Sequence, residues 1–174
     1  MKNTDPPHRT NKLPKVTPEI SKFIENVGMY FENTGLPRIG GRILGLLMIS
    51  HGPLSAENIE SLLRVSRGSI STNMRILIAS GLVEKTSVTG DRMTFYVFPE
   101  TALEQRMAVG IQSALAFKKV SEQGLAALST EDYARHHLKN AIEWSDMLVE
   151  AFQDAITEWR TRQGSPTERK QPVY

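Results

Sequence analysis

The spacing of apolar residues predicts two helices near the start of the chain. In residues 17–33 the apolar positions recur at steps of three and four residues, which is the period of one helix face. Residues 38–50 show the same period after a glycine–proline break. This second segment contains Gly40, Gly41 and Gly45, which are poor helix formers. We therefore expect another element to pack closely against them.

Two shorter helices follow, separated by a tight turn. Ser55 is placed to cap a helix over residues 56–63, and residues 64–65 form the turn. Ser66 is placed to cap the next helix, whose apolar stripe ends at Gly81. This succession predicts a helix-turn-helix.

The period changes from helical to extended after Gly81. Residues 82–88 and 93–98 contain many β-branched and aromatic residues, and the turn between them contains Gly90. The pattern predicts a β-hairpin with Arg92 at its tip. A hairpin directly after a helix-turn-helix is typical of a winged helix.

Long helices are predicted for the rest of the chain. Helical periodicity runs from beyond Pro99 to about Leu128, and Ser129 or Thr130 is expected to cap a last helix. That helix has the most regular seam in the sequence, with alternating steps of four and three residues: Leu138, Ile142, Ser145, Val149, Phe152, Ile156 and Trp159. We interpret the six apolar positions of the seam as a dimer interface. Packing against the preceding helix of the same chain is the alternative.

These elements predict a mainly α-helical winged helix-turn-helix protein with a small β-hairpin wing and a dimerisation helix at its C-terminal end. We expect a disordered tail at 1–16, N-terminal helices at 17–52, a DNA-binding region at 53–98, a C-terminal dimerisation region at 99–162 and a tail at 163–174. The sequence has no cysteine, no signal peptide and no segment long enough to span a bilayer. We therefore expect a cytoplasmic protein without membrane contact.

Charge is unevenly distributed, although the net charge is only +2. Residues 36–96 contain seven basic and four acidic residues, a net of +3, whereas residues 97–159 contain five basic and ten acidic residues, a net of −5. The cationic part would face a polyanion while the acidic helices turn away from it. Solvated helix faces explain the same pattern, so charge alone does not select a nucleic acid.

The outer face of the second short helix has the composition of a DNA-reading surface. Opposite Ile70, helical geometry collects a glycine, small hydroxyls and one arginine, without an acidic residue: Gly68, Ser69, Thr72 and Arg75, with Ser71 at the flank. Serine and threonine can donate to phosphates or base edges, and arginine can bridge O6 and N7 of guanine. Glycine lets the DNA backbone come close.

Three more arginines extend the predicted DNA-binding set. Arg67 lies at the positive N-terminal end of the same helix, where it is placed for a phosphate or base contact. Arg92 is placed to enter a narrow minor groove. Arg42, between the glycines of the second helix, completes the set.

Several of these segments match the pattern of a known family. The matching residues are Gly35–Leu47 with its Gly-Arg-Ile-Leu-Gly run, Leu54–Ser55, Ser66–Ser71 with Leu77, Gly81–Val83, and Gly90–Arg92 before Phe95–Tyr96. Over about residues 17–160 the chain resembles the GbsR-like branch of the MarR family of transcriptional regulators. The Gly-Arg-Ile-Leu-Gly helix in register with the helix-turn-helix and wing is the most specific part of the match.

The resemblance implies a homodimer, held by its first and last helices, that binds a pseudo-palindromic operator on double-stranded DNA as a repressor. It also implies a recognition helix over residues 67–80. Members of this branch often control compatible-solute genes, and some sense choline through an aromatic pocket, so a small-molecule effector stays an open option. The aromatic residues available for such a cage are Phe23, Tyr30, Phe31, Phe117 and Trp144. Each lies on or near an apolar stripe, which favours core packing.

The sequence argues against an enzyme and leaves one rival function. His136 and His137 are adjacent rather than four residues apart, and no phosphate loop or serine elbow is present. We therefore expect no catalytic residue, metal or cofactor. The rival is a winged-helix subunit that makes protein contacts in a larger assembly. Ile76, an apolar residue beside the hydroxyl-rich face, does not fit the DNA-reading composition; contact with a thymine methyl group and packing against the wing are the two options for it.

Overall fold

The computed structural model describes residues 13–89, 92–130 and 132–163. It divides into two compact units, one ending at Glu100 and the other beginning at Thr101. The predicted tails lie outside the described residues except at positions 13–16 and 163, and so do Gly90 and Asp91 of the hairpin tip. In the part of the chain that is described, no helix is both long and apolar enough to cross a membrane.

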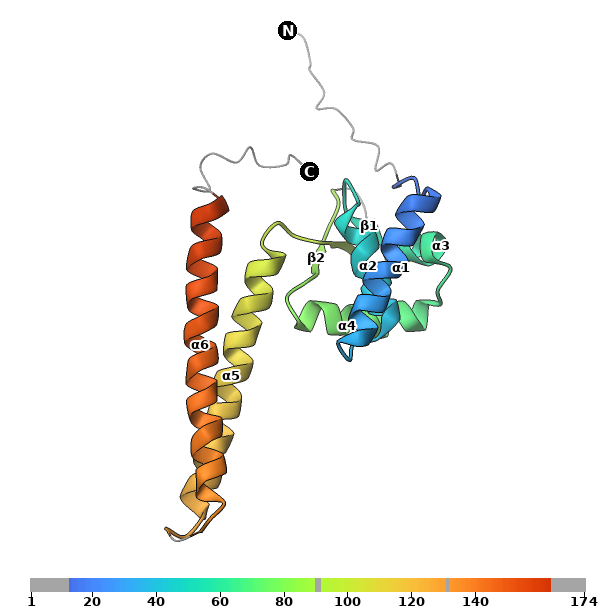
Figure 1. The fold of residues 1–174 in the computed structure, drawn as a ribbon. Helices are drawn as coiled ribbons and strands as arrows, with labels where there is room; N and C mark the ends of the chain where they lie inside the picture. Colours follow the sequence, from blue (N-terminus) through green and yellow to red (C-terminus); the bar gives the residue numbers. More distant parts are fainter. Residues whose placement is uncertain (1–12, 90–91, 131, 164–174) are drawn as a thin grey trace. The chain divides into compact units, whose positions relative to one another are not determined.

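The first unit contains four helices and a small sheet (Figure 1). Its elements are α1 (Pro18–Asn33), α2 (Arg38–Met48), β1 (Leu54–Ser55), α3 (Ala56–Leu63), α4 (Arg67–Ala79), β2 (Glu84–Thr86) and β3 (Phe95–Val97). The strands are antiparallel in the order β1-β3-β2. The fold is thus mainly helical with a small wing, as predicted.

Strand β1 is an element that the apolar pattern does not predict. It pairs Leu54 with Tyr96 and Ser55 with Phe95. Two residues are too few to show the alternation that identifies a strand. Ser55 also caps α3, so the same residue ends the strand and begins the helix.

The glycines of α2 allow α1 to pack in backbone contact, which confirms the expected close approach. A Cβ atom at Gly41 would lie 2.6 Å from the carbonyl oxygen of Val27 and 2.8 Å from Cα of Gly28. A Cβ at Gly45 would lie 3.2 Å from Cβ of Val27. On its other sides α2 buries Ile43 and the leucines beside it. Helix α2 is therefore the centre of the first unit.

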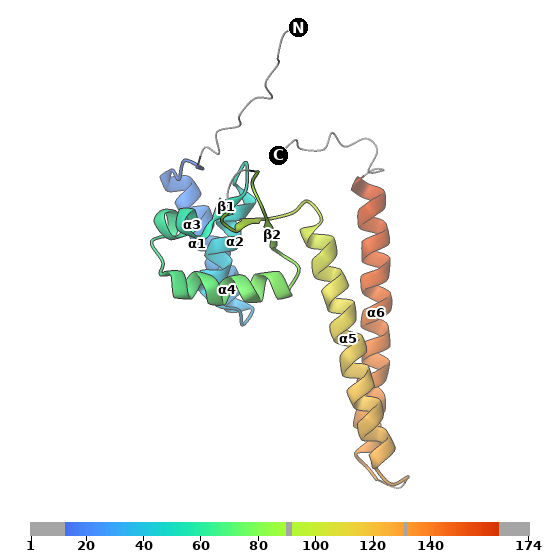
Figure 2. The same cartoon turned by 180° about the vertical axis from the view of Figure 1, so that it is seen from behind.

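The second unit is an antiparallel pair of long helices, α5 (Ala102–Ala127) and α6 (Arg135–Gln163), which lie side by side in both views (Figures 1 and 2). The prediction that Ser129 or Thr130 caps the last helix is wrong, because α6 begins several residues later. A turn occupies this connection instead, in which Asp132 Oδ1 accepts a hydrogen bond from the Ala134 amide at 2.8 Å. Arg135 donates to the carbonyl oxygens of Leu125 and Leu128 and closes the turn.

The predicted seam of α6 contacts α5 of the same chain at two glycines. A Cβ at Gly110 would lie 2.8 Å from the ring of Phe152, and one at Gly124 would lie 3.2 Å from a methyl group of Leu138. Ser145, in the middle of the seam, is fully buried. These contacts are those of the intramolecular alternative. The role of the seam between subunits stays a prediction.

Candidate nucleic-acid interface

The turn between α3 and α4 is set by two helix caps and one left-handed residue. Ser55 and Asn58 form a reciprocal capping box, with hydrogen bonds of 3.0 and 3.1 Å between side chain and backbone. Arg64 ends α3 with a φ of 53°, a conformation that non-glycine residues rarely adopt. Ser66 then caps α4 by accepting a hydrogen bond from the Ser69 amide. After this turn the chain runs in a new direction, and α4 crosses α2 (Figure 2).

Helix α4 presents a polar face to solvent, as its sequence predicts. Its exposed residues on that face are Gly68, Ser71, Thr72 and Arg75. Ser69 is half-buried, and its hydroxyl accepts a hydrogen bond from Ser66 at 3.1 Å. Ile70, Met74 and Leu77 are buried in the core. Ile76 is half-buried at the edge of the polar face.

Arg67, at the start of α4, is held by two carboxylates of α3. Its Nε donates to Glu60 at 2.8 Å, and its Nη2 donates to Glu57 at 2.8 Å. The hydrogen bond to Glu60 and the two negative charges raise the pKa of Arg67. Nothing in the sequence pattern indicated this pairing, because the partners come from the preceding helix.

Arg42 is engaged inside the first unit. Its side chain is 23% exposed, its Nη2 donates to the carbonyl oxygen of Leu63 at 3.1 Å, and its Nε lies 2.7 Å from Glu25 in an ion pair without hydrogen-bond geometry. The side chain thus links α1 and α2 to the end of α3. The contact with DNA predicted for Arg42 would require its side chain to leave these partners.

The wing places Arg92 at the surface. Arg92 is exposed and directly follows the two tip residues that lie outside the described part of the chain. Strands β2 and β3 pair Glu84 with Val97 and Thr86 with Phe95, and Phe95 is buried. The core therefore anchors the base of the wing on one side.

Asn73 is a residue of this region that sequence reasoning missed. It is a buried polar side chain in the middle of α4, and its Nδ2 donates to the carbonyl oxygen of Ser69 at 2.8 Å. Its Oδ1 lies 3.0 Å from the place of a Cβ at Gly40. Asn73 therefore connects α4 to α2. A polar residue within the Ile70–Met74–Leu77 stripe was the signal that could have revealed it.

Aromatic rings meet in separate pairs within each unit. Tyr30 and Phe31 lie 5.9 Å apart between centroids, and Phe117 and Trp144 lie 6.2 Å apart. Phe31 is buried in the core of the first unit. Within the described residues, no ring contact joins Phe23 to Tyr30 or Phe31, and no three His, Asp or Glu side chains gather as metal ligands.

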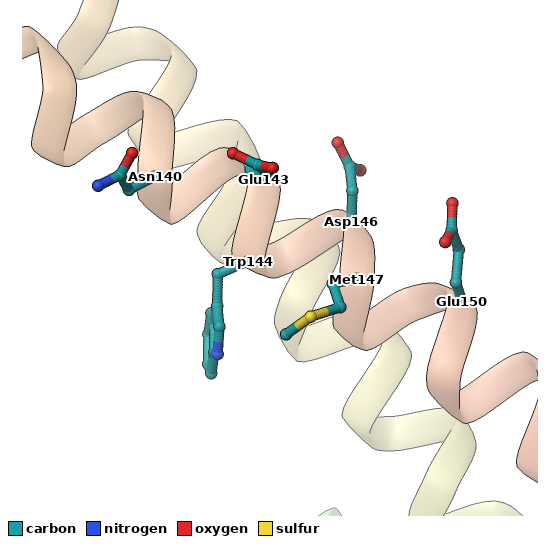
Figure 3. Close-up of a pocket in the computed structure, with 6 residues that line it drawn as sticks. All are labelled: Asn140, Glu143, Trp144, Asp146, Met147 and Glu150. Carbon is teal, nitrogen blue, oxygen red and sulfur yellow. The ribbon is translucent and has the colours of Figure 1, made fainter.

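Side chains of α6 border an open depression of about 490 Å³ (Figure 3). The lining residues are Asn140, Glu143, Trp144, Asp146, Met147 and Glu150. All six belong to one helix, so the depression is a surface and not an enclosed site. The acidic side chains point to one side of the helix and Trp144 to the other.

The chain is similar to known regulators in both sequence and structure. The model of the MarR family matches residues 34–92. The HTH-type transcriptional regulator MmpR5 of Mycobacterium tuberculosis is 32% identical over 151 residues, which cover 84% of this chain and 90% of the relative. A crystal structure of a transcriptional regulator is 30% identical and superposes with a TM-score of 0.77 over 83% of this chain and 99% of its own.

Proposed function

Because the chain belongs to the MarR family of winged-helix transcriptional regulators, we propose that it represses transcription as a homodimer bound to a pseudo-palindromic operator. Regulators of this family bind DNA and act as dimers. The observation that supports the proposal is the exposed face of α4, which presents Ser71, Thr72 and Arg75 without an acidic residue. In this proposal α4 enters the major groove, and Arg92 of the wing contacts the minor groove.

The rival function, a winged-helix module for protein contacts, is not favoured. Its reading helix would present an apolar or acidic outer face, whereas the described α4 face is hydroxyl-rich and basic. Ile76 is half-buried and adds little apolar surface to that face. The assignment to the GbsR-like branch is a further part of the proposal, supported by the glycines of α2 that pack against α1.

The proposal predicts DNA binding that weakens steeply with salt. We expect the full chain to bind a duplex from its own upstream region that holds two half-sites about one helical turn apart. The logarithm of the binding constant should fall linearly with the logarithm of the salt concentration, because neutralising each phosphate releases counterions. Fluorescence anisotropy from about 50 to 300 mM KCl measures the slope. A scrambled duplex of equal length is the control. A binding constant that does not change with salt, or that is equal for the two duplexes, would contradict the proposal.

We propose that the dimer interface includes the part of the α6 seam that α5 leaves half-exposed. It also includes exposed apolar residues elsewhere on α6. Ile142, Val149, Ile156 and Trp159 are half-buried within the single chain. Trp144 and Met147 are 50% and 56% exposed. Large apolar side chains exposed together are typical of an interaction surface.

Replacing Trp144 and Met147 by glutamate is expected to give monomers by light scattering, because an interface cannot bury two unpaired carboxylates. Tyr133→Glu, at a residue 83% exposed in the turn before α6, is the matched control and should stay dimeric. These positions avoid Phe152, whose replacement would disturb the packing of α5 on α6 itself. A variant that stays dimeric after both replacements would contradict the proposed interface.

A further inference from the structure

Three charged side chains meet where α3 approaches the start of α4. Arg67 lies between Glu57 and Glu60, and each carboxylate accepts one hydrogen bond of 2.8 Å from the guanidinium. The arginine balances only one of the two acids, so the group has a net charge of −1. The surface around Arg67 is therefore not cationic, although residues 36–96 as a whole carry a net positive charge.

The two hydrogen bonds fix the orientation of the Arg67 guanidinium. Nε and Nη2 are occupied on separate carboxylates, and within the described residues Nη1 makes no hydrogen bond. A guanidinium has five N–H donors in a rigid plane, so holding two of them fixes the directions of the remaining three. An arginine without such partners, in contrast, can reorient to contact any phosphate within reach.

Release of Arg67 to the DNA would carry an electrostatic penalty. It would leave Glu57 and Glu60 unpaired beside a polyanion, and like charges at short distance repel. All three side chains are partly in solvent, with 57%, 39% and 67% of Glu57, Glu60 and Arg67 exposed. The carboxylates can therefore act on approaching DNA as well as on the arginine.

We propose that Glu57 and Glu60 act as specificity determinants, which suppress binding to arbitrary DNA and hold Arg67 as an oriented donor for the operator alone. This inference rests on the proposed function, since it requires DNA at α4. Arg67 then contributes short-range hydrogen bonds to the operator and little to sequence-independent attraction. The positive potential that draws in any duplex comes instead from arginines such as Arg75 and Arg92, for which the described residues show no ion pair.

The test compares operator and scrambled duplexes in the variant Glu57→Gln/Glu60→Gln. Glutamine keeps an acceptor oxygen for Arg67 and removes both negative charges. We expect roughly 10-fold tighter binding to the scrambled duplex near 100 mM KCl, a steeper salt dependence and a smaller operator preference. Thermal stability should be almost unchanged, because exposed ion pairs contribute little to folding. The matched control Glu122→Gln/Asp154→Asn alters the net charge equally on exposed residues of α5 and α6.

Arg67→Ala in both backgrounds completes the experiment. In the native background we expect it to weaken operator binding at least 5-fold while leaving the scrambled duplex within about twofold. In the glutamine background it should also weaken the scrambled duplex severalfold. Equal losses on the scrambled duplex in both backgrounds would overturn the inference, as would a control variant that binds the scrambled duplex as tightly as the glutamine variant. If the native chain shows no salt-dependent preference for its operator, the proposed function itself fails, which is a different result.

Discussion

Replacing Gly41 by alanine is expected to destabilise the protein by about 3 kcal/mol, the upper part of the usual range for an overpacked core. The new methyl group would lie 2.6 Å from the Val27 carbonyl oxygen and 2.8 Å from Cα of Gly28. Both neighbours are backbone atoms, so no rotamer change can relieve the contact. Helix α1 would have to move away from α2, and the core around Ile24 and Phe31 would open. Urea unfolding followed by circular dichroism, at fixed protein concentration, measures the change in free energy of unfolding.

Gly68→Ala makes the same chemical change and is the matched control. A Cβ at Gly68 meets nothing within 4 Å. Alanine at this helical position should leave the free energy of unfolding unchanged or raise it by up to about 1 kcal/mol. The same variant should bind the operator more weakly if the DNA backbone passes close to α4. Equal destabilisation by both replacements would show that the contact at Gly41 does not limit packing.

The second large effect is expected for Arg75→Ala, which should weaken operator binding by about 1–3 kcal/mol. Arg75 is exposed on the polar face of α4, beside Ser71 and Thr72. Among the described residues it has no ion pair that would have to break first. Its guanidinium is therefore available to bridge O6 and N7 of one guanine, so the loss should concentrate at a single base position.

Two replacements separate base reading from simple charge. Arg75→Lys keeps the charge and loses the two-pronged geometry, so it should recover the salt slope but not the base preference. Arg106→Ala removes an exposed arginine of α5 and should leave the affinity nearly unchanged. Affinities for a panel of operators with single base changes provide the measurement. A uniform loss over the panel would make Arg75 a phosphate contact and would contradict its assignment as the base-reading residue.

Local patterns were sufficient to predict helices α3 and α4 and the turn between them. Ser55 and Ser66 satisfy free amides at helix starts, and this capping acts over three residues of chain. The exposed face of α4 follows from the helical period alone, since Ile70 and Met74 must point to the core. Interactions of such short range are encoded in consecutive residues, and they are visible before any tertiary structure is known.

Other features depended on partners far along the chain. Arg42 and Arg67 were indistinguishable from Arg75 as sequence, but Glu25, Glu57 and Glu60 pair with the first two only in the folded chain. An ion pair depends on which side chains the packing brings together, and nothing in the sequence around an arginine specifies a partner on another helix.

The long seam of α6 shows the same division. Its regular period was sufficient to predict a helix with one buried face, since an apolar stripe must be covered. The sequence could not specify the covering surface, because a stripe fits a helix of the same chain or of another equally well. In the folded chain α5 covers Phe152 and Leu138, because Gly110 and Gly124 have no side chains and leave space for them.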